Sequence, residues 1–207
     1  MSAQRPDNPG GPERPQGPGQ PTPYTQEIQH AQVTARIPEK VSRGVFSTAV
    51  IVLQGPHEFV LDFVLGMAQP HQIAARVIVP PTVMPALIAA LRENLHHYQA
   101  KFGPPPPLPV PPPPAAPPRI EEIYDQLKLP EDVMSGVYAN AAMISHTPAE
   151  FCFDFITTFF PRSAVSCRVY VSAARLPGVL DSLTRSYQQY QQKLASAPPP
   201  PPHQPPL

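Results

Sequence analysis

The chain has 207 residues, of which 35 are proline, and it carries 15 basic and 15 acidic side chains. This balance argues against nucleic-acid binding, because phosphate neutralisation usually requires a basic footprint. No apolar run approaches the ~20 residues that span a bilayer, and the start lacks the apolar core of a signal peptide, so we expect a cytoplasmic protein without membrane contact.

The prolines divide the chain into segments. Proline-rich tracts lack amide donors and cannot build a packed core, so residues 1–23 and 196–207 are predicted to be disordered tails and residues 104–118 a linker. Between them lie two segments, 28–103 and 119–195, each near the lower size limit for an independent core. The tracts are either spacers or polyproline ligands for a protein partner.

The two segments are copies of one unit. Residues 37–102 align with residues 129–194 at a constant offset of 92, without a gap and with nineteen identities. Identity at a fixed offset over this length indicates duplication of a structural unit. The lead-ins, residues 24–37 and 119–129, show no clear pattern and are left unassigned.

Each unit is predicted to contain three strands and a helix. In the first copy, β-branched and apolar residues predict strands at 45–53, 58–65 and 74–79. Apolar residues then recur every three or four positions and predict a helix over residues 82–102, which ends at Gly103. The expected fold class is α+β, with two tandem β-β-β-α units, each an antiparallel sheet packed on one long helix.

A hairpin between the second and third strands would pair an acid with a base in both copies. With the turn centred near Gln69, Asp62 lies opposite Arg76. With the turn centred near Pro161, Asp154 lies opposite Arg168. We therefore predict two ion pairs, structural or at an interface.

The two faces of this hairpin differ in composition. One face carries only apolar side chains, among them Phe59, Phe63 and Val77, and should lie under the helix as the core. The face with the ion pairs also carries Val60 and Ile78, and it is too apolar for an ordinary wet surface. We expect it to pack against the other repeat of the same chain or against a second copy in a homodimer.

Motifs for catalysis, cofactors or metals are weak in this sequence. Asp62 and Asp154 are candidate catalytic carboxylates, but a structural ion pair explains both more simply. His96 and His97 are replaced by glutamines in the other copy, which indicates a solvated helix face rather than a metal site. Neither a phosphate-binding glycine loop nor a nucleophile elbow is present, so we expect no cofactor, no metal and no catalytic residue.

Motifs in both copies resemble the prokaryotic family known as domain of unknown function 3467. The opening motif is carried by the second copy, in Tyr138-Ala139-Asn140, Ser145-His146-Thr147-Pro148, Glu150-Phe151 and Asp154-Phe155. The closing motif is carried by the first, in Leu91-Arg92-Glu93-Asn94-Leu95, Tyr98 and Phe102-Gly103. The resemblance implies a bacterial or archaeal cytoplasmic protein of one small repeat, here fused into a tandem, and it brings no established activity.

The copies depart from the family pattern in different places. The first has Phe46-Ser47-Thr48 where the motif has Tyr-Ala-Asn, so the repeats have either divided one function or kept it in one copy. The candidate functional surface consists of Tyr138, Asn140, Ser145, His146 and Glu150. We predict a non-enzymatic binding or scaffolding protein. Binding of single-stranded nucleic acid through sheet aromatics is the alternative, and an enzyme comes third.

Overall fold

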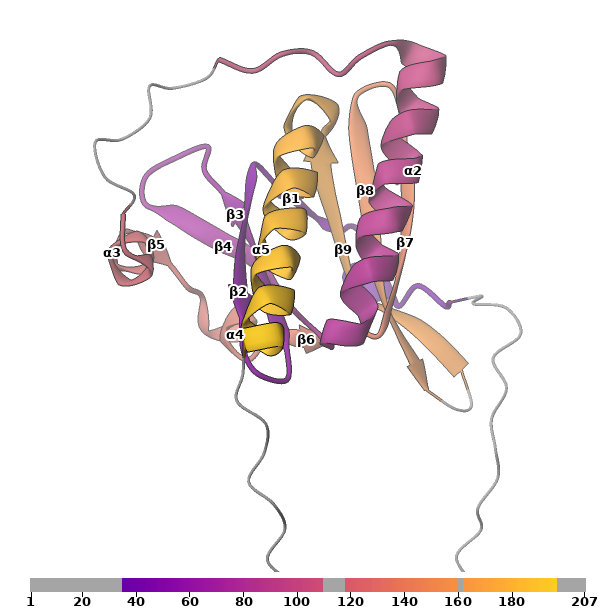
Figure 1. Cartoon of the computed structure of the whole chain (residues 1–207). Helices are drawn as coiled ribbons and strands as arrows, with labels where there is room; N and C mark the ends of the chain where they lie inside the picture. Colours follow the sequence, from indigo (N-terminus) through magenta and orange to yellow (C-terminus); the bar gives the residue numbers. More distant parts are fainter. Residues whose placement is uncertain (1–34, 110–117, 160–161, 197–207) are drawn as a thin grey trace, which may run out of the picture. The chain divides into compact units, whose positions relative to one another are not determined.

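A computed structural model describes residues 35–109, 118–159 and 162–196 of the chain (Figure 1). The predicted disordered tail at residues 1–23, the second tail from residue 197 onward and residues 110–117 of the linker lie outside this part. All described residues belong to one structural unit, which begins at Gln32.

Both repeats contain strands followed by one long helix, and the predicted α+β class with two tandem units is confirmed. The first repeat contains α1 (Glu39–Ser42), β1 (Val45–Ser47), β2 (Ala49–Gln54), β3 (Phe59–Leu65), β4 (His71–Val79), the 3-10 turn η1 (Pro81–Val83) and α2 (Met84–Phe102). The second contains α3 (Ile120–Asp125), β5 (Leu127–Lys128), α4 (Glu131–Met134), β6 (Val137–Tyr138), β7 (Ala141–His146), β8 (Glu150–Phe159), β9 (Arg162–Ser172), η2 (Ala173–Arg175) and α5 (Leu176–Ser196).

The strands form two sheets, and each sheet contains strands of both repeats. One sheet has the order β2-β3-β4-β5, with β6 also paired to β4, and we call it the first sheet. The other, the second sheet, has the order β1-β9-β8-β7. The central hairpins are antiparallel, whereas β1 pairs with β9 and β6 with β4 in parallel. The first repeat therefore gives one short strand, β1, to the second sheet, and the second repeat gives two, β5 and β6, to the first sheet.

The prediction of one continuous strand over residues 45–53 was wrong. The chain leaves β1 in the second sheet and enters β2 in the first sheet, with the break at Thr48. Ser47 is fully buried at this crossing, where its hydroxyl donates to the carbonyl oxygens of Ala49 and Val64. Composition favoured one strand because β-branched and apolar residues continue across both parts. Composition does not show that the chain changes from one sheet to the other.

Each sheet is packed on one long helix, and that helix belongs to the other repeat. Phe59 of the first sheet contacts Tyr190 of α5 with ring centroids 5.2 Å apart. Tyr98 of α2 contacts Phe151 of the second sheet at the same distance, and its hydroxyl donates to the Pro148 carbonyl oxygen at 2.9 Å. Figure 1 shows the two helices side by side in front of the sheets, and α2 and α5 also contact each other.

The core lies between the helices and the sheets, on the face that the sequence predicted. Buried phenylalanines from both sheets meet there, as Phe63 lies 5.5 Å from Phe155 between ring centroids. Burial of one such ring stabilises a fold by about 1.5–3 kcal/mol. Because these rings come from both repeats, the two repeats share one core.

The segment that opens each repeat borders the sheet of the other repeat. The segment that contains α3, β5 and α4 borders β4 of the first sheet, with His71 paired to Leu127. On the second sheet, α1 lies against β9, and Arg36 forms a bridge with Ala164. The sequence assigned no structure to either lead-in.

The predicted register of both hairpins is confirmed. Asp62 lies opposite Arg76 in β3 and β4, and Asp154 lies opposite Arg168 in β8 and β9. The register shifts at the same place in both copies, between Phe63 and Val64 in the first and between Phe155 and Ile156 in the second. The duplication thus extends to the irregularities of the backbone.

Gly44 and Gly136 stand directly before β1 and β6, where the chain approaches the sheet of the other repeat closely. Their φ angles are 65° and 68°, in the left-handed region. A Cβ atom on Gly44 would lie 2.6 Å from Tyr170 Cε2, and one on Gly136 would lie 2.9 Å from Arg76 Cγ. A side chain at either position would therefore strain the backbone and push the lead-in away from the sheet.

We predict that Gly136→Ala lowers the free energy of unfolding by about 2 kcal/mol, because alanine is disfavoured at positive φ. Gly178→Ala is the matched control, since a Cβ atom on this glycine of α5 would have no heavy atom within 4 Å. This control should raise stability by about 0.5–1 kcal/mol through helix propensity. Urea unfolding measures both changes, and equal effects of the two variants would contradict the close approach.

Candidate functional site

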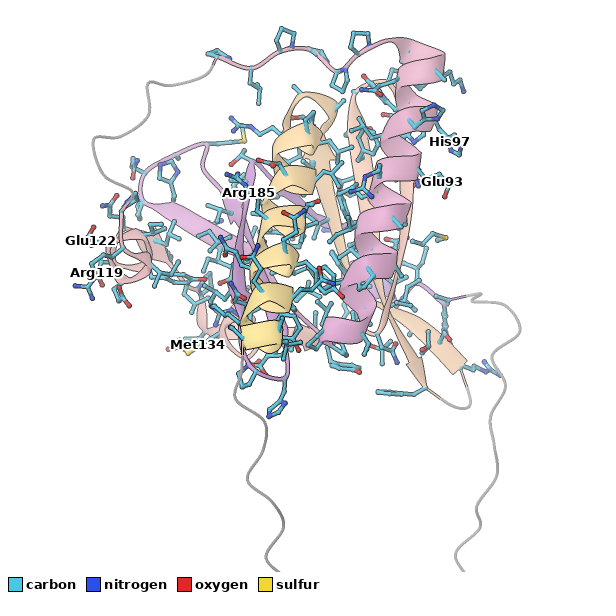
Figure 2. The ribbon with its side chains drawn as sticks, in the orientation of Figure 1. Glu93, His97, Arg119, Glu122, Met134 and Arg185 are labelled. Carbon is cyan, nitrogen blue, oxygen red and sulfur yellow. The ribbon has the colours of Figure 1, made fainter. Side chains whose placement is uncertain are left out.

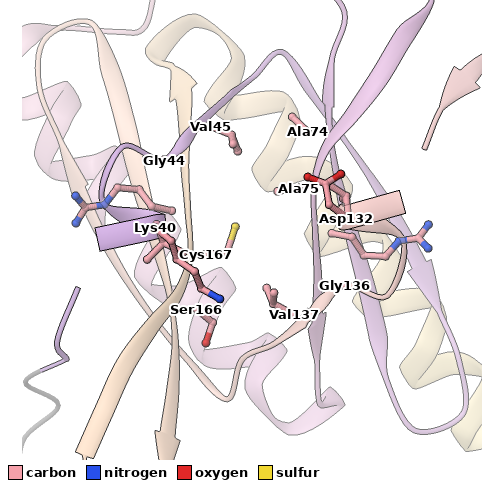
Figure 3. A pocket seen from close by; sticks show the side chains of 14 residues that line it. Lys40, Gly44, Val45, Ala74, Ala75, Asp132, Gly136, Val137, Ser166 and Cys167 are labelled. Atoms are coloured by element: carbon pink, nitrogen blue, oxygen red, sulfur yellow. The ribbon is translucent and has the colours of Figure 1, made fainter. Parts of the chain in front are cut away.

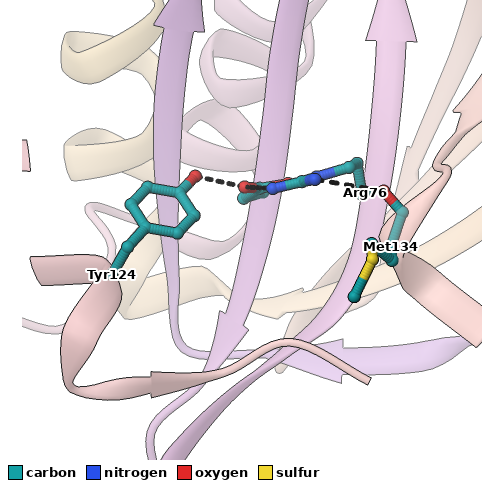
Figure 4. Close-up of polar contacts among 4 residues, drawn as sticks. Arg76, Tyr124 and Met134 are labelled. Atoms are coloured by element: carbon teal, nitrogen blue, oxygen red, sulfur yellow. Dashed lines mark hydrogen bonds and ion pairs between the residues drawn. The ribbon is translucent and has the colours of Figure 1, made fainter. Parts of the chain in front are cut away.

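The ion pair of the first sheet is bidentate and buried (Figure 4). Arg76 Nε and Nη2 each donate to a carboxylate oxygen of Asp62 at 2.8 Å. Asp62 is fully buried and also accepts a hydrogen bond from the Tyr124 hydroxyl of α3. Arg76 Nη1 donates to the carbonyl oxygen of Met134 at 3.1 Å, so both partners hold the lead-in of the second repeat.

The ion pair of the second sheet repeats this arrangement. Arg168 Nε and Nη2 donate to Asp154 at 2.7 Å, and Arg168 Nη1 donates to the carbonyl oxygen of Ser42 at 3.3 Å. Ser42 corresponds to Met134 at the offset of 92. The hydrogen bond to Asp154 raises the pKa of the guanidinium, which stays charged. Each pair therefore joins a sheet to a short helix of the other repeat.

The candidate surface residues Tyr138 and Asn140 lie where the second repeat crosses between sheets. The ring of Tyr138 is 42% exposed and stacks on Phe159 with ring centroids 5.8 Å apart. Asn140 Oδ1 accepts hydrogen bonds from the amide and the hydroxyl of Thr158, at 2.7 and 2.9 Å. In the first repeat Thr48 replaces this asparagine, and its hydroxyl accepts from the amide of Gly66 at 2.8 Å.

Of the other candidate surface residues, His146 lies near the end of α2. His146 Nδ1 is 3.3 Å from Asn94 Oδ1, and the His146 ring lies between aromatic rings of α2 and β8. Burial, with smaller contributions from Lys101 and His97, lowers the pKa of His146. Ser145 is exposed on β7, and Glu150 begins β8.

The structure does not bring these five residues together. Asn140 precedes β7 and His146 ends it, so about 20 Å of extended chain separates them. Tyr138 and Asn140 fix a strand crossing, whereas His146 packs beneath the end of a helix. The motif residues thus contribute to two separate places.

The first repeat has a different surface at the position that corresponds to His146. Gln54 stands there, and its Nε2 donates to Gln189 Oε1 at 3.2 Å. Where Phe102 packs beside His146, the smaller Leu194 leaves a cavity of about 300 Å³ between Gln54, Tyr190 and the end of α5. The two ends of the molecule have therefore diverged.

A cavity of about 160 Å³ lies between the two sheets, and the sequence did not predict it (Figure 3). Its lining consists of seven pairs of residues related by the offset of 92: Lys40 and Asp132, Val41 and Val133, Gly44 and Gly136, Val45 and Val137, Ala74 and Ser166, Ala75 and Cys167, Arg76 and Arg168. Because every lining residue has its counterpart in the lining, the cavity lies on the pseudo-twofold axis between the repeats. We call it the axial cavity.

The two walls of the axial cavity differ in chemistry. Figure 3 shows Lys40, Ser166 and Cys167 on one side and Asp132, Ala74 and Ala75 on the other. Burial, and then the charge of Asp154, raises the pKa of the Cys167 thiol to about 12, so this sulfur is protonated at neutral pH. One wall thus offers a cation beside a hydroxyl that is engaged by Thr157, and the other offers an anion and two methyl groups.

The candidate metal residues are not gathered in one place. Within the described ranges, no group of three or more His, Cys, Asp or Glu side chains is placed to hold a metal ion. Figure 2 shows His97 on the outer side of α2, one turn from Glu93, and the two side chains lie 4.0 Å apart and largely exposed. This agrees with the solvated helix face that the sequence predicted.

Comparison with protein families decides the relationship of the chain. The profile of the family described as "Protein of unknown function (DUF3467)" matches residues 12–105 and again residues 112–196. The chain belongs to the DUF3467 family. It contains two DUF3467 repeats, as the motifs indicated.

No curated protein and no solved structure matches this DUF3467 tandem. Among its described residues, none of the helices combines the length and the apolar character needed to cross a membrane. The axial cavity was missed because the sequence pattern does not show that the segments before β1 and β6 lie against the sheet of the other repeat. The available signal was the identical Gly44 and Gly136, two glycines at matching positions beside a strand.

We predict that Asp62→Asn and Asp154→Asn each lower the free energy of unfolding by about 3 kcal/mol, because each leaves a partly buried guanidinium without its counter-charge. Asp181→Asn is the control. Its ion pair with Arg185 is 2.6 Å long but exposed on α5, so its loss should change stability by less than about 1 kcal/mol. Thermal and urea unfolding measure the three variants. The prediction is contradicted if none of the three changes the free energy of unfolding appreciably.

Proposed function

We propose that this DUF3467 tandem is a non-enzymatic binding protein whose two repeats form one binding unit, with the axial cavity as its site. The observation that carries this proposal is the lining of the cavity by seven equivalent pairs from both repeats. A cavity lined by both copies depends on their pairing, which gives a physical reason for fusing them in one chain.

The walls of the cavity are held in place by the strongest polar contacts near it. The aliphatic parts of Arg76 and Arg168 line the cavity, while their guanidinium groups are engaged by Asp62 and Asp154. Sites whose supporting side chains are fixed by packing and hydrogen bonds lose less entropy when a ligand binds. This arrangement therefore favours a preformed site over a flexible one.

Several polar groups at the cavity are poorly suited to catalysis. The carboxylates of Asp62 and Asp154, which hold the lining residues Arg76 and Arg168, are each bound to a guanidinium. The Cys167 thiol, with a pKa of about 12, has almost no thiolate at neutral pH, and the thiolate is the nucleophilic form. These observations support binding rather than turnover.

We predict that small molecules from a fragment library shift the backbone amide signals of Gly44, Gly136 and Cys167 together, because the three residues line one cavity. The measurement is an NMR titration of the ¹⁵N-labelled chain. Ala74→Leu should abolish the shifts by filling the cavity, and Ala89→Leu, on the exposed side of α2, should preserve them. Absence of shifts with every fragment, or shifts that persist in Ala74→Leu, would refute the site.

A second candidate function, binding of single-stranded nucleic acid, is favoured by one exposed feature, which joins β6 of the first sheet to β8 of the second. Tyr138 and Phe159 are stacked with their planes 7° apart and are both exposed. Arg162 is the strand partner of Phe159, and the backbone of Arg36 pairs beside it with Ser163. An exposed aromatic pair near arginines is a minimal platform for stacking bases.

For this second function we predict that Phe159→Ala weakens binding of a labelled single-stranded oligonucleotide about tenfold, since stacking contributes about 1–3 kcal/mol per base. Phe46→Ala is the matched control, because Phe46 corresponds to Tyr138 and is equally exposed at 42%. Fluorescence anisotropy at low salt measures both variants. If the wild-type chain gives no anisotropy change, nucleic-acid binding is excluded as the function.

A further inference from the structure

We infer that the axial cavity binds a small zwitterion, a molecule with a carboxylate and an ammonium group on a short aliphatic body, such as a free amino acid. This inference rests on the proposed function and adds the chemical class of the ligand. It follows from the size of the cavity, from the charges at its walls and from the difference between its two halves.

The size of the cavity limits the ligand to a few atoms. Its volume is about 160 Å³. An apolar cavity of about 150 Å³ accommodates benzene, whereas drug-sized ligands occupy pockets of about 300–1,000 Å³. A ligand of about six to nine non-hydrogen atoms fits this volume, which includes amino acids with short side chains.

The charges that face the cavity come from one residue pair. Lys40 and Asp132 occupy equivalent positions, both are exposed, and no ion pair joins them to each other or to another side chain of the described part. The charges of Arg76 and Arg168 are already neutralised by their aspartates. A ligand therefore meets one positive and one negative charge, on opposite walls.

The remaining lining fixes the orientation and the body of the ligand. Lys40 and Asp132 lie on opposite walls, so the carboxylate is placed at Lys40 and the ammonium group at Asp132, while the Ser166 hydroxyl beside Lys40 is engaged by Thr157 (Figure 3). Val45 and Val137 also line the cavity and favour an aliphatic body. Cys167, as a protonated thiol, acts here as a small apolar side chain.

A zwitterion matches these walls better than a simple ion does. A ligand with only a negative charge would pair with Lys40 but would be repelled by Asp132. A ligand with only a positive charge would pair with Asp132 but would be repelled by Lys40. Complementary charges give specificity by making wrong partners unfavourable as well as by attracting the right one. The cavity thus favours a ligand that carries both a carboxylate and an ammonium group.

The test compares matched probes on the full-length chain by isothermal titration calorimetry and by the amide shifts of Gly44 and Gly136. The probes are valine, 4-aminobutanoate and 5-aminopentanoate, with pentanoate and pentylamine as single-charge controls. At least one zwitterion should bind about tenfold more tightly than either control, because only it satisfies both walls. Pentanoate or pentylamine binding as tightly as every zwitterion would overturn the inference.

Variants of the two rim charges make the test specific. Lys40→Met and Asp132→Asn should each weaken zwitterion binding about tenfold, and Lys128→Met, an exposed lysine outside the cavity, should leave it unchanged. The double variant Lys40→Asp with Asp132→Lys should recover most of the affinity, because the pseudo-twofold relation presents the same two charges with the walls exchanged. These residues are exposed, so the variants should fold, which thermal unfolding checks.

Two results separate failure of the ligand class from failure of the proposed function. If neutral fragments shift the cavity amides while zwitterions bind no better than single ions, the ligand class is wrong and the cavity remains a binding site. If neither fragments nor zwitterions shift these amides, both proposals are refuted. Unchanged affinity in Lys40→Met also overturns the inference.

Discussion

The exchange of strands between the two repeats is the constraint on which the rest of the structure depends. At Thr48 and at Asn140 the chain leaves one sheet and enters the other, so every later element of each repeat starts from a position fixed by its twin. The strands before and after each crossing pair with different sheets. The crossing residue itself accepts a backbone hydrogen bond through its side chain, at Thr48 in the first repeat and at Asn140 in the second. Neither sheet is complete without the other repeat.

The helices and the ion pairs follow from this exchange. Because β1 pairs with β9, α1 lies against the second sheet, where Arg168 reaches the Ser42 carbonyl oxygen. The same relation brings Met134 to Arg76 on the first sheet. Each Asp–Arg pair then satisfies a charge within its sheet and a carbonyl oxygen at the end of a short helix from the other repeat. A buried pair adds little net stability to a fold, yet it specifies which segment can lie over it.

The sequence predicted those features that depend on local pattern. Alternation of side chains placed Phe59 and Phe63 in the core, and the offset of 92 predicted that Asp154 would meet Arg168. It did not predict that α5 covers Phe59, because the apolar stripe of a helix is complementary to either of two nearly identical sheets. It also missed the axial cavity, since Lys40 and Asp132 come together only through the exchange and are ordinary exposed charges when each is considered alone.

Fusion of the repeats has a consequence that two identical chains would not share. In a symmetric dimer of either repeat, the position of Lys40 and Asp132 would present two lysines or two aspartates across the axis, and like charges facing one cavity repel each other. In the tandem, the two copies differ at this position, at Ala74 and Ser166, and at Ala75 and Cys167, while Val41, Gly44, Val45 and Arg76 match their counterparts. Four of the seven lining pairs are thus identical, and the three that differ make the cavity asymmetric. Under the proposed ligand class, this is the difference a zwitterion requires, because its two ends carry opposite charges and only an asymmetric cavity can bind both.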